Sequence, residues 1–386
     1  MCSLSSNVPL LSIVIPTKNR YETLFPTLEA ILGNISDGRL EIVVQDNSDD
    51  PSLANAYFSD RPDPRIRYSY MAGLLSIVDN TEAALARANG EYVTFIGDDD
   101  FVSPQILEFV QDFSERGIVA AIYPPAYYWW KSVKFSDLSR FHQPGAFWYP
   151  LEVSASECTI ATAQELVNVL EQGAVSLFDL PRVYHGIVHR SVLHGIKAKS
   201  GRFVNGASPD MALAVAVSLV IESHVKVNTP LTVYGASKNS GGGWTASKTH
   251  FGKISEQSHL PQWTKDHWNE NLPPIWSEHT IYPQTAMEVM SALGQTCSLN
   301  FAAFYASMMI NEPHLRGFVM PFAARFLRRH PQRLILFLMI ATKKMFGRLR
   351  RAFRSRVSGL PFKLSFFDSP DDCMRHMFRG ASSSQE

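Results

Sequence analysis

Three consecutive aspartates, Asp98, Asp99 and Asp100, follow the short apolar run "EYVTFIG", which is typical of a buried strand. Adjacent carboxylates repel one another, so the fold must place positive charge beside them. Carboxylate oxygens are ligands that Mg²⁺ and Mn²⁺ prefer. In an extended segment alternate side chains point the same way, so we expect Asp98 and Asp100 to share a metal ion while Asp99 points to a sugar or to backbone. The alternative is an acidic turn that starts the next helix.

Two further polar clusters follow predicted strands. The run "LLSIVIP" leads to Thr17, Lys18, Asn19 and Arg20, and "LEIVV" leads to Asp46. Ligands of parallel sheets bind beyond the carboxyl ends of the strands, where these clusters fall. Lys18 and Arg20 could meet a diphosphate, and Asp46 could accept a hydrogen bond from a nucleobase. Solvated loop charges and a turn aspartate are the alternatives.

Strand-like and helix-like segments alternate over the first hundred residues, which predicts an α/β fold with a mostly parallel sheet flanked by helices. We expect an α/β domain over residues 1–240. Residues 241–312 are expected to hold a flexible loop and helical packing elements. Residues 313–386 are expected to form a basic, amphipathic, helical carboxy-terminal region.

The formal net charge is zero but unevenly spread. Residues 1–312 hold 21 Lys and Arg against 32 Asp and Glu, whereas residues 313–363 hold 13 Lys and Arg and no acid. Helical spacing places an apolar stripe in the basic part: Leu315, Phe318, Val319, Phe322 and Phe326. We favour attachment to an anionic membrane surface. Packing on the acidic body of the same chain is the alternative; nucleic-acid binding is disfavoured because no recognition fold accompanies the charges.

Several classes of protein are disfavoured. The four cysteines form no CxxC pair, so we expect neither a zinc site nor a disulfide framework, and we expect a reducing compartment. We expect neither a signal peptide nor a spanning segment, hence a cytoplasmic, peripheral protein. No GxGxxG follows a strand, which disfavours a dinucleotide oxidoreductase.

The segments "SIVIPTKNR", "LEIVVQDNSDD", "ANGEYVTFIGDDD" and "SPDMALA", in this order, resemble the family 2 glycosyltransferases with the GT-A fold, over about residues 9–240. The resemblance implies an inverting transfer from a nucleotide-diphosphate sugar, with UDP- or dTDP-sugars favoured. It implies Mn²⁺ or Mg²⁺ as cofactor and a glycan or lipid-linked acceptor.

The same resemblance implies roles for individual residues. Asp210 takes the position of the catalytic base, with Asp179 and Glu222 as alternatives, and the metal ligands are Asp98 and Asp100. The residues implied to bind the nucleotide-sugar are Thr17, Asn19, Arg20, Asp46, Asp98 and Asp99.

The chain departs from the family pattern in one loop. "AGLLSIVDN" lacks the Arg that relatives often carry, so its phosphate contact is expected to be lost or to move to Lys238 or Lys248. Ser237 and Ser240 lie where a loop facing the phosphate or the acceptor is expected. The segment "SKNSGGGWTASKTH" is expected to be a flexible loop or lid.

Aromatic and histidine clusters are weaker candidates. Trp129 and Trp130 could stack on an acceptor sugar, although such residues more often belong to a core. A metal role for His185, His189 and His194 is disfavoured, because no acidic residue lies near them in the sequence.

Two other functions stay open. A sugar nucleotidyltransferase is also α/β and metal-dependent, but "PTKNRYETL" lacks the glycines of its phosphate loop. The second open function is that of a non-catalytic, membrane-associated binding protein with a degenerate site.

Overall fold

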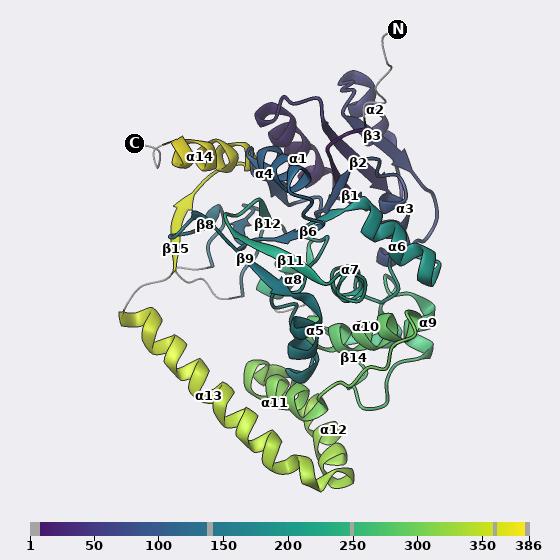
Figure 1. Ribbon diagram of the computed structural model, residues 1–386, viewed down its shortest axis with the longest axis vertical. Helices are drawn as coiled ribbons and strands as arrows, with labels where there is room; N and C mark the ends of the chain where they lie inside the picture. Colours follow the sequence, from purple (N-terminus) through teal and green to yellow (C-terminus); the bar gives the residue numbers. More distant parts are fainter. Residues whose placement is uncertain (1–7, 137–141, 248–250, 358–360, 383–386) are drawn as a thin grey trace.

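The computed structural model describes residues 8–136, 142–247, 251–357 and 361–382 (Figure 1). Within these residues an eight-stranded sheet has the order β3-β2-β1-β4-β10-β6-β11-β9. The first four of these strands are parallel neighbours, as are β6 and β11, whereas β10 and β9 run antiparallel to their neighbours. The strands are β1 (Leu11–Thr17), β2 (Leu40–Asp46), β3 (Ile66–Tyr70), β4 (Tyr92–Phe95), β6 (Ala120–Ile122), β9 (Ser154–Ala161), β10 (Ile187–His189) and β11 (Ser223–Asn228).

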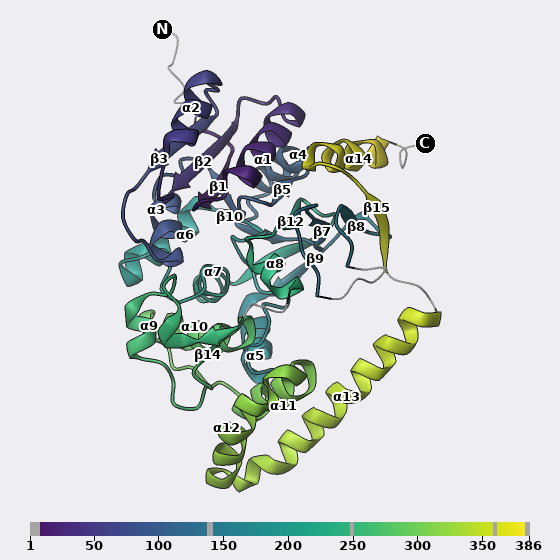
Figure 2. The same ribbon diagram turned by 180° about the vertical axis from the view of Figure 1, so that it is seen from behind.

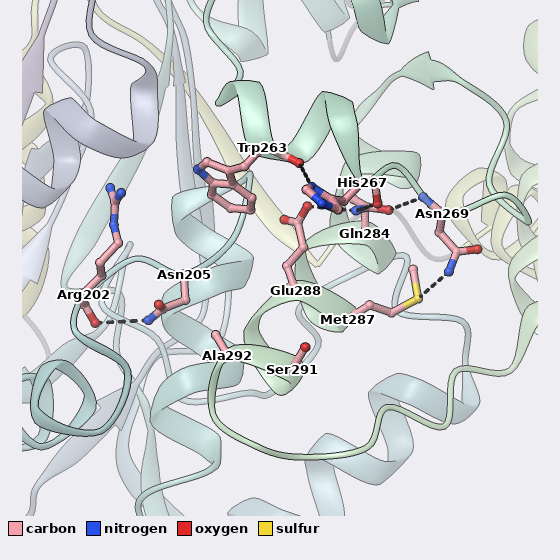
Figure 3. Close-up of a pocket in the computed structure, with 10 residues that line it drawn as sticks. All are labelled: Arg202, Asn205, Trp263, His267, Asn269, Gln284, Met287, Glu288, Ser291 and Ala292. Carbon is pink, nitrogen blue, oxygen red and sulfur yellow. Dashed lines mark hydrogen bonds between the residues drawn. The ribbon is translucent and has the colours of Figure 1, made fainter.

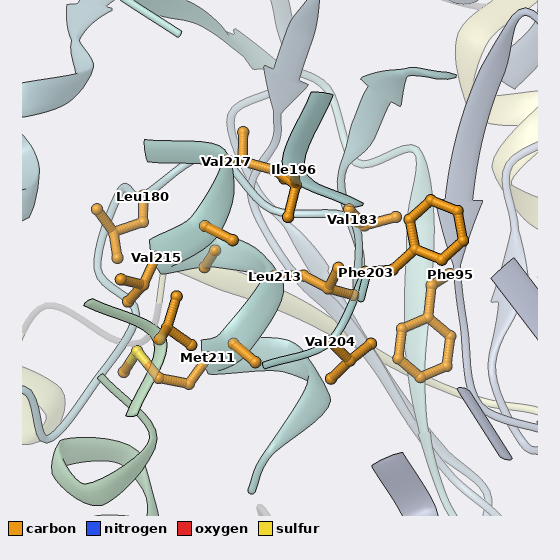
Figure 4. Close-up of a cluster of buried hydrophobic side chains, with 14 of the residues drawn as sticks. Phe95, Leu180, Val183, Ile196, Phe203, Val204, Met211, Leu213, Val215 and Val217 are labelled. Atoms are coloured by element: carbon orange, nitrogen blue, oxygen red, sulfur yellow. The ribbon is translucent and has the colours of Figure 1, made fainter. Parts of the chain in front are cut away.

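Helices cover both faces of this sheet, which explains why its central strands are apolar without alternation. Ile13 and Ile15 of β1 belong to the same core as Leu28 of α1, while Val14 belongs to the core that contains Met211 of α7 (Figure 4). The predicted α/β fold class is confirmed. The helices of this part are α1 (Tyr21–Asn34), α2 (Ser52–Asp60), α3 (Ile77–Leu85), α4 (Ile106–Glu115), α5 (Thr162–Glu171), α6 (Arg190–Ser200) and α7 (Pro209–Ser218).

A second sheet joins distant parts of the chain in the order β15-β8-β7-β12-β5. Its strands are β5 (Phe101–Val102), β7 (Ala126–Trp129), β8 (Ala146–Pro150), β12 (Thr232–Ala236) and β15 (Phe362–Phe366). β15 pairs antiparallel with β8, so the region after residue 313, expected to be helical, also holds one strand. The following helix α14 (Pro370–Ser382) returns to α1, where Asn34 Nδ2 donates to Asp371 Oδ1 at 2.8 Å.

A helical part lies at the end of the molecule opposite α2, as Figure 2 shows for α11, α12 and α13. The remaining elements are α8 (Gly241–Ala246), β13 (Gly252–Lys253), α9 (Gln262–Asp266), β14 (Ile275–Trp276), α10 (Glu278–Ala292), α11 (Phe301–Asn311), α12 (Arg316–Arg329) and α13 (Leu334–Val357). Across the described ranges, every helix is too short or too polar to cross a lipid bilayer.

Two expectations for this part need correction. The glycines 241–243 start helix α8 rather than a loop, and Ser240 caps it by accepting a hydrogen bond from Gly243 N at 3.2 Å. The apolar stripe of α12 is not an open face: Leu315 and Val319 are buried, and Phe322 is half-buried against the same core. Of the five stripe residues, Phe318 alone is more than half exposed.

Candidate active site

Three polar clusters meet at one edge of the main sheet. Thr17 ends β1 and pairs in register with Asp46, which ends β2. β4 lies on the other side of β1 and ends at Phe95, three residues before the first aspartate of the triplet. Parallel strands bring their carboxyl ends to one edge, so three runs that are far apart in the sequence supply one site.

Arg20 is the positive charge beside the first two aspartates. Its Nη1 lies 2.7 Å from Asp98 Oδ1 and its Nη2 lies 2.8 Å from Asp99 Oδ1. Thr17 Oγ1 donates to the other oxygen of Asp98 at 2.6 Å, and Ser237 N donates to Asp99 at 2.9 Å. Both carboxylates are almost fully buried. The single guanidinium of Arg20 therefore pairs with two buried carboxylates. With both carboxylates ionised, these three side chains carry a net negative charge.

Asp100 points away from that group and is held by the fold. Its Oδ2 accepts from Gly97 N at 2.6 Å, from the Tyr184 hydroxyl at 3.1 Å and contacts His185 Nε2 at 2.9 Å. Its Oδ1 accepts from Gly235 N at 2.6 Å. Four partners saturate this carboxylate, so it is a structural anchor of the turn.

The triplet thus differs from the extended segment that we expected. β4 ends at Phe95, and Asp100 N donates back to Gly97 O, so residues 97–100 form a turn in which alternation does not hold. Asp98 and Asp99 face one cation together, and Asp100 stands apart. His185 has an acidic partner that its sequence neighbours do not supply, because Asp100 meets it across 85 positions of the sequence.

The pKa directions follow this division. Burial raises the pKa of Asp98 and of Asp99, and the opposing pull of Arg20 does not offset it. Burial disfavours the charged form of Asp100 too, but His185 and the N–H donors of Gly235 and Gly97 outweigh burial and lower its pKa. The single charge of Arg20 does not offset the burial of the first two aspartates, whereas the partners of the third do offset its burial.

This donor set partly fits a divalent cation. Two carboxylates with raised pKa values and an uncompensated negative charge match a hard cation that binds through one or two carboxylates plus phosphate oxygens. Asp100 fits less well, because a metal would have to replace its four partners from the surrounding fold, whereas at Asp98 and Asp99 it would replace the shared ion pair with Arg20. Among the described residues no group of three or more His, Cys, Asp or Glu side chains is arranged to hold a metal ion by itself.

Asp46 is enclosed by two tyrosines. The hydroxyls of Tyr21 and Tyr68 donate to its Oδ2 at 2.6 and 2.9 Å, and Ser48 N donates to its Oδ1 at 2.8 Å. Burial first, and then the hydrogen bond to Asp46, raise the pKa of both tyrosines. A base at this position would meet two aromatic residues and a carboxylate. The sequence pattern missed both tyrosines.

The loop after β1 is fixed to the loop after β2. Asn19 has a left-handed φ of 56°, and its backbone N–H donates to Ser48 Oγ at 2.7 Å. Its side chain exchanges hydrogen bonds with Asp49. Lys18 Nζ donates to Asn47 Oδ1 at 3.3 Å, so this lysine braces the loop rather than the aspartate triplet.

Asp210 lies in the first turn of α7, as its sequence context suggests: Ser208 is the N-cap residue and Pro209 the first helical position. Ser208 Oγ donates to one carboxylate oxygen of Asp210, and the Tyr282 hydroxyl of α10 donates to the other. The negative charges of Asp100, Asp99 and Asp210 all act on Tyr184, whose pKa is raised first by burial and then by them. The direct partners of Asp210 are therefore Ser208 and Tyr282, and its link to the triplet is the effect of its charge on Tyr184.

Asp179 and Glu222, the alternatives to Asp210 as catalytic base, are less suitably placed. Both oxygens of Asp179 are bound by Lys226 Nζ at 2.8 Å, and Glu222 is exposed. Glu278, which the sequence analysis missed, starts helix α10, and its side chain is exposed although the charge of Asp210 acts on it. Desolvation of its carboxyl group raises its pKa, the nearby His279 opposes this, and the charge of Asp210 adds to the rise.

The weaker candidates divide into two groups. Ser237 contacts Asp99 through its N–H, and its Oγ accepts from Arg20 at 2.9 Å; Ser240 Oγ accepts from Ser237 N. Trp130 Nε1 donates to Asp99 O at 2.8 Å, which makes it a support of the turn. In contrast, Lys238 is exposed, Trp129 packs on Phe135, and Lys248 lies outside the described residues.

A cavity of about 490 Å³ lies apart from these residues, between α9, α10 and the loop before α7 (Figure 3). Its polar groups largely bond one another: Gln284 Nε2 donates to Glu288 Oε1 at 2.8 Å, and Asn269 N donates to Gln284 Oε1 at 3.0 Å. Glu288 also accepts from Ala207 N at 3.0 Å, and burial raises its pKa to about 7. The hydrogen bond from Ala207 N to Glu288, which lines this cavity, holds the segment that precedes Asp210 in place.

Residues 12–169 match the family described as "Glycosyl transferase family 2". The curated "Uncharacterized protein y4gI" of Sinorhizobium fredii is 30% identical over 123 residues; that match covers 31% of this chain and 14% of the relative's length.

Two solved structures of S. aureus TarS are also similar to the chain. One is the 1–349 fragment in complex with UDP-GlcNAc: 14% identity, a TM-score of 0.48, and 93% of this chain and 97% of the other covered. The other is the same fragment in complex with UDP: 13% identity, a TM-score of 0.39, and 59% and 61% covered. Residues 12–169 of this chain thus match glycosyl transferase family 2, and they form part of the α/β fold described above.

Proposed function

We propose that this chain is an inverting glycosyltransferase that moves a sugar from a nucleotide-diphosphate sugar, a UDP- or dTDP-sugar, to an acceptor hydroxyl. The observation that carries the proposal is the site at the edge of the main sheet, where Asp46 lies between two tyrosines and Arg20 pairs with Asp98 and Asp99. Asp46 and its tyrosines suit a nucleobase, Arg20 suits a diphosphate, and Asp210 suits an acceptor hydroxyl.

Each part has one task in this proposal. Asp46 accepts an N–H from the base, and Arg20 pairs with the diphosphate. Asp98 and Asp99 would hold Mn²⁺ or Mg²⁺, which would supply positive charge to the diphosphate. Asp210 takes the proton of the acceptor hydroxyl, which attacks the anomeric carbon from the face opposite the diphosphate. Tyr282 and Ser208 orient the carboxylate of Asp210.

The acceptor is a glycan or a lipid-linked glycan, and the reaction takes place at the cytoplasmic face of a membrane, in polysaccharide or glycoconjugate synthesis. The support for this location is the excess of positive charge over residues 313–363. An anionic surface attracts such a segment, and salt weakens the attraction.

The aspartate triplet offers a sharp test, because its members differ in role. Asp99→Asn should lose Mn²⁺-stimulated binding of UDP-sugar, measured by calorimetry, while the melting temperature stays near that of the wild type. Asp100→Asn should lower the melting temperature, because it removes a buried charge that faces His185. The proposed cation site is wrong if the Asp99 variant binds donor and Mn²⁺ as tightly as the wild type.

A second measurement tests the reaction class. Incubation with UDP- or dTDP-sugar and Mn²⁺ should release the nucleoside diphosphate, slowly with water and faster with a glycan acceptor. Release of a nucleoside triphosphate on addition of pyrophosphate would instead identify a nucleotidyltransferase. Binding of donor without any turnover, across a panel of acceptors, would favour a non-catalytic binding protein.

A further inference from the structure

Helix α13 carries an apolar stripe that faces solvent. Ile335, Leu338, Met339, Phe346 and Leu349 are each more than half exposed. Their spacing of three, one, seven and three residues places them on one side of a helix. Such a row of large apolar side chains is unusual on a protein surface and marks an interaction site.

The opposite side of α13 is fixed to the protein body. Phe337 packs against the core that contains Phe304 and Tyr305 of α11. Arg348 Nη1 donates to Ile310 O at the end of α11 at 2.6 Å. The helix is therefore docked along one side, and Figure 2 shows it running along the edge of the molecule with its other side open.

The charges around the stripe favour one kind of partner. The segment 313–363 holds 13 Lys and Arg and no acid. Lys343 and Arg350 are exposed, and their spacing of seven residues puts both along one border of the stripe. A second copy docking through the same face would bring these like charges together. Nucleic acid would match the charge and leave the apolar row in water.

We propose that α13 lies in the plane of an anionic lipid membrane, with this stripe sunk beneath the headgroups and the basic border at the lipid phosphates. A helix of 24 residues would lie over about 36 Å of membrane surface. This surface deepens the proposed membrane location and rests on it, but not on the chemistry of the catalytic site. It also replaces the α12 stripe, which the core covers.

Co-sedimentation with vesicles tests the surface directly. The full chain should bind vesicles of phosphatidylcholine with phosphatidylglycerol, bind pure phosphatidylcholine weakly, and lose affinity as salt rises. The triple variant Ile335→Gln, Leu338→Gln, Phe346→Gln should lose at least about a hundredfold in partition coefficient, because three large apolar side chains no longer leave water.

A matched control replaces exposed apolar residues of the body: Leu53→Gln, Leu151→Gln, Val167→Gln. It should bind vesicles like the wild type. Far-ultraviolet circular dichroism and UDP-sugar binding should be unchanged in both triple variants. A failure of the membrane proposal can therefore be told apart from a failure of the proposed glycosyltransferase function. The proposal is overturned if the full chain stays in the supernatant at low salt, or if the body control loses as much binding as the stripe variant. It is likewise overturned if light scattering shows a dimer that only the stripe variant abolishes.

Discussion

Gly235 is the position where a single methyl group should displace the aspartate turn. A Cβ built on Gly235 would lie 1.7 Å from Asp99 O and 3.0 Å from Trp130 Nε1. Ordinary contact needs about 3.4 Å, so Gly235→Ala must move β12 or the turn by well over 1 Å. The backbone N–H of Gly235, which donates to Asp100 at 2.6 Å, would move with it. Overpacking of this kind costs about 1–3 kcal/mol.

The assay compares catalysis with stability. A displacement of about 1 Å in a positioning group can cost on the order of 10²-fold in rate, so we expect donor turnover to fall by that factor. The melting temperature should fall by several degrees, at about 2–4 °C per kcal/mol. Gly195→Ala is the matched control, because nothing lies within 4 Å of its Cβ in the middle of α6; it should be neutral or slightly stabilising. Turnover and melting of Gly235→Ala like those of the wild type would refute the argument.

Four further outcomes are expected. Asp210→Asn should lower turnover by about 10² or more with donor affinity and melting temperature near wild type; a variant that keeps turnover but melts lower would make Asp210 a helix-end residue. Tyr282→Phe should move the pH profile of turnover more than it moves donor affinity, because it removes a hydrogen bond to Asp210. Burial raises the pKa of Asp98 to about 7 from 3.8, so the free energy of unfolding falls as pH rises through about 7. Mn²⁺ should therefore raise the melting temperature more at pH 8 than at pH 5, and an equal shift at both would contradict this. His185→Phe should lower stability by about 3–5 kcal/mol, measured by urea unfolding, because Asp100 loses a buried partner.

Local sequence determined the elements that carry the site. A strand buried on both faces must be continuously apolar, which is why "LSIVIP" and "EIVV" predicted parallel strands and why their ends held the polar clusters. The start of α7 was equally readable, because Ser208 and Pro209 suit the N-cap and the first helical position whatever surrounds them. The fold class followed from the alternation of such segments.

Contacts between distant segments decided the rest. Which charge neutralises which aspartate depends on residues that folding brings together: His185 reaches Asp100 across 85 positions and Gly235 across 135. The same holds for the two amphipathic helices near the end of the chain. Both α12 and α13 carry an apolar stripe, and only packing shows that the α12 stripe meets a core while the α13 stripe meets solvent. Periodicity shows that a helix has an apolar side, but burial depends on a neighbour whose position the whole chain sets.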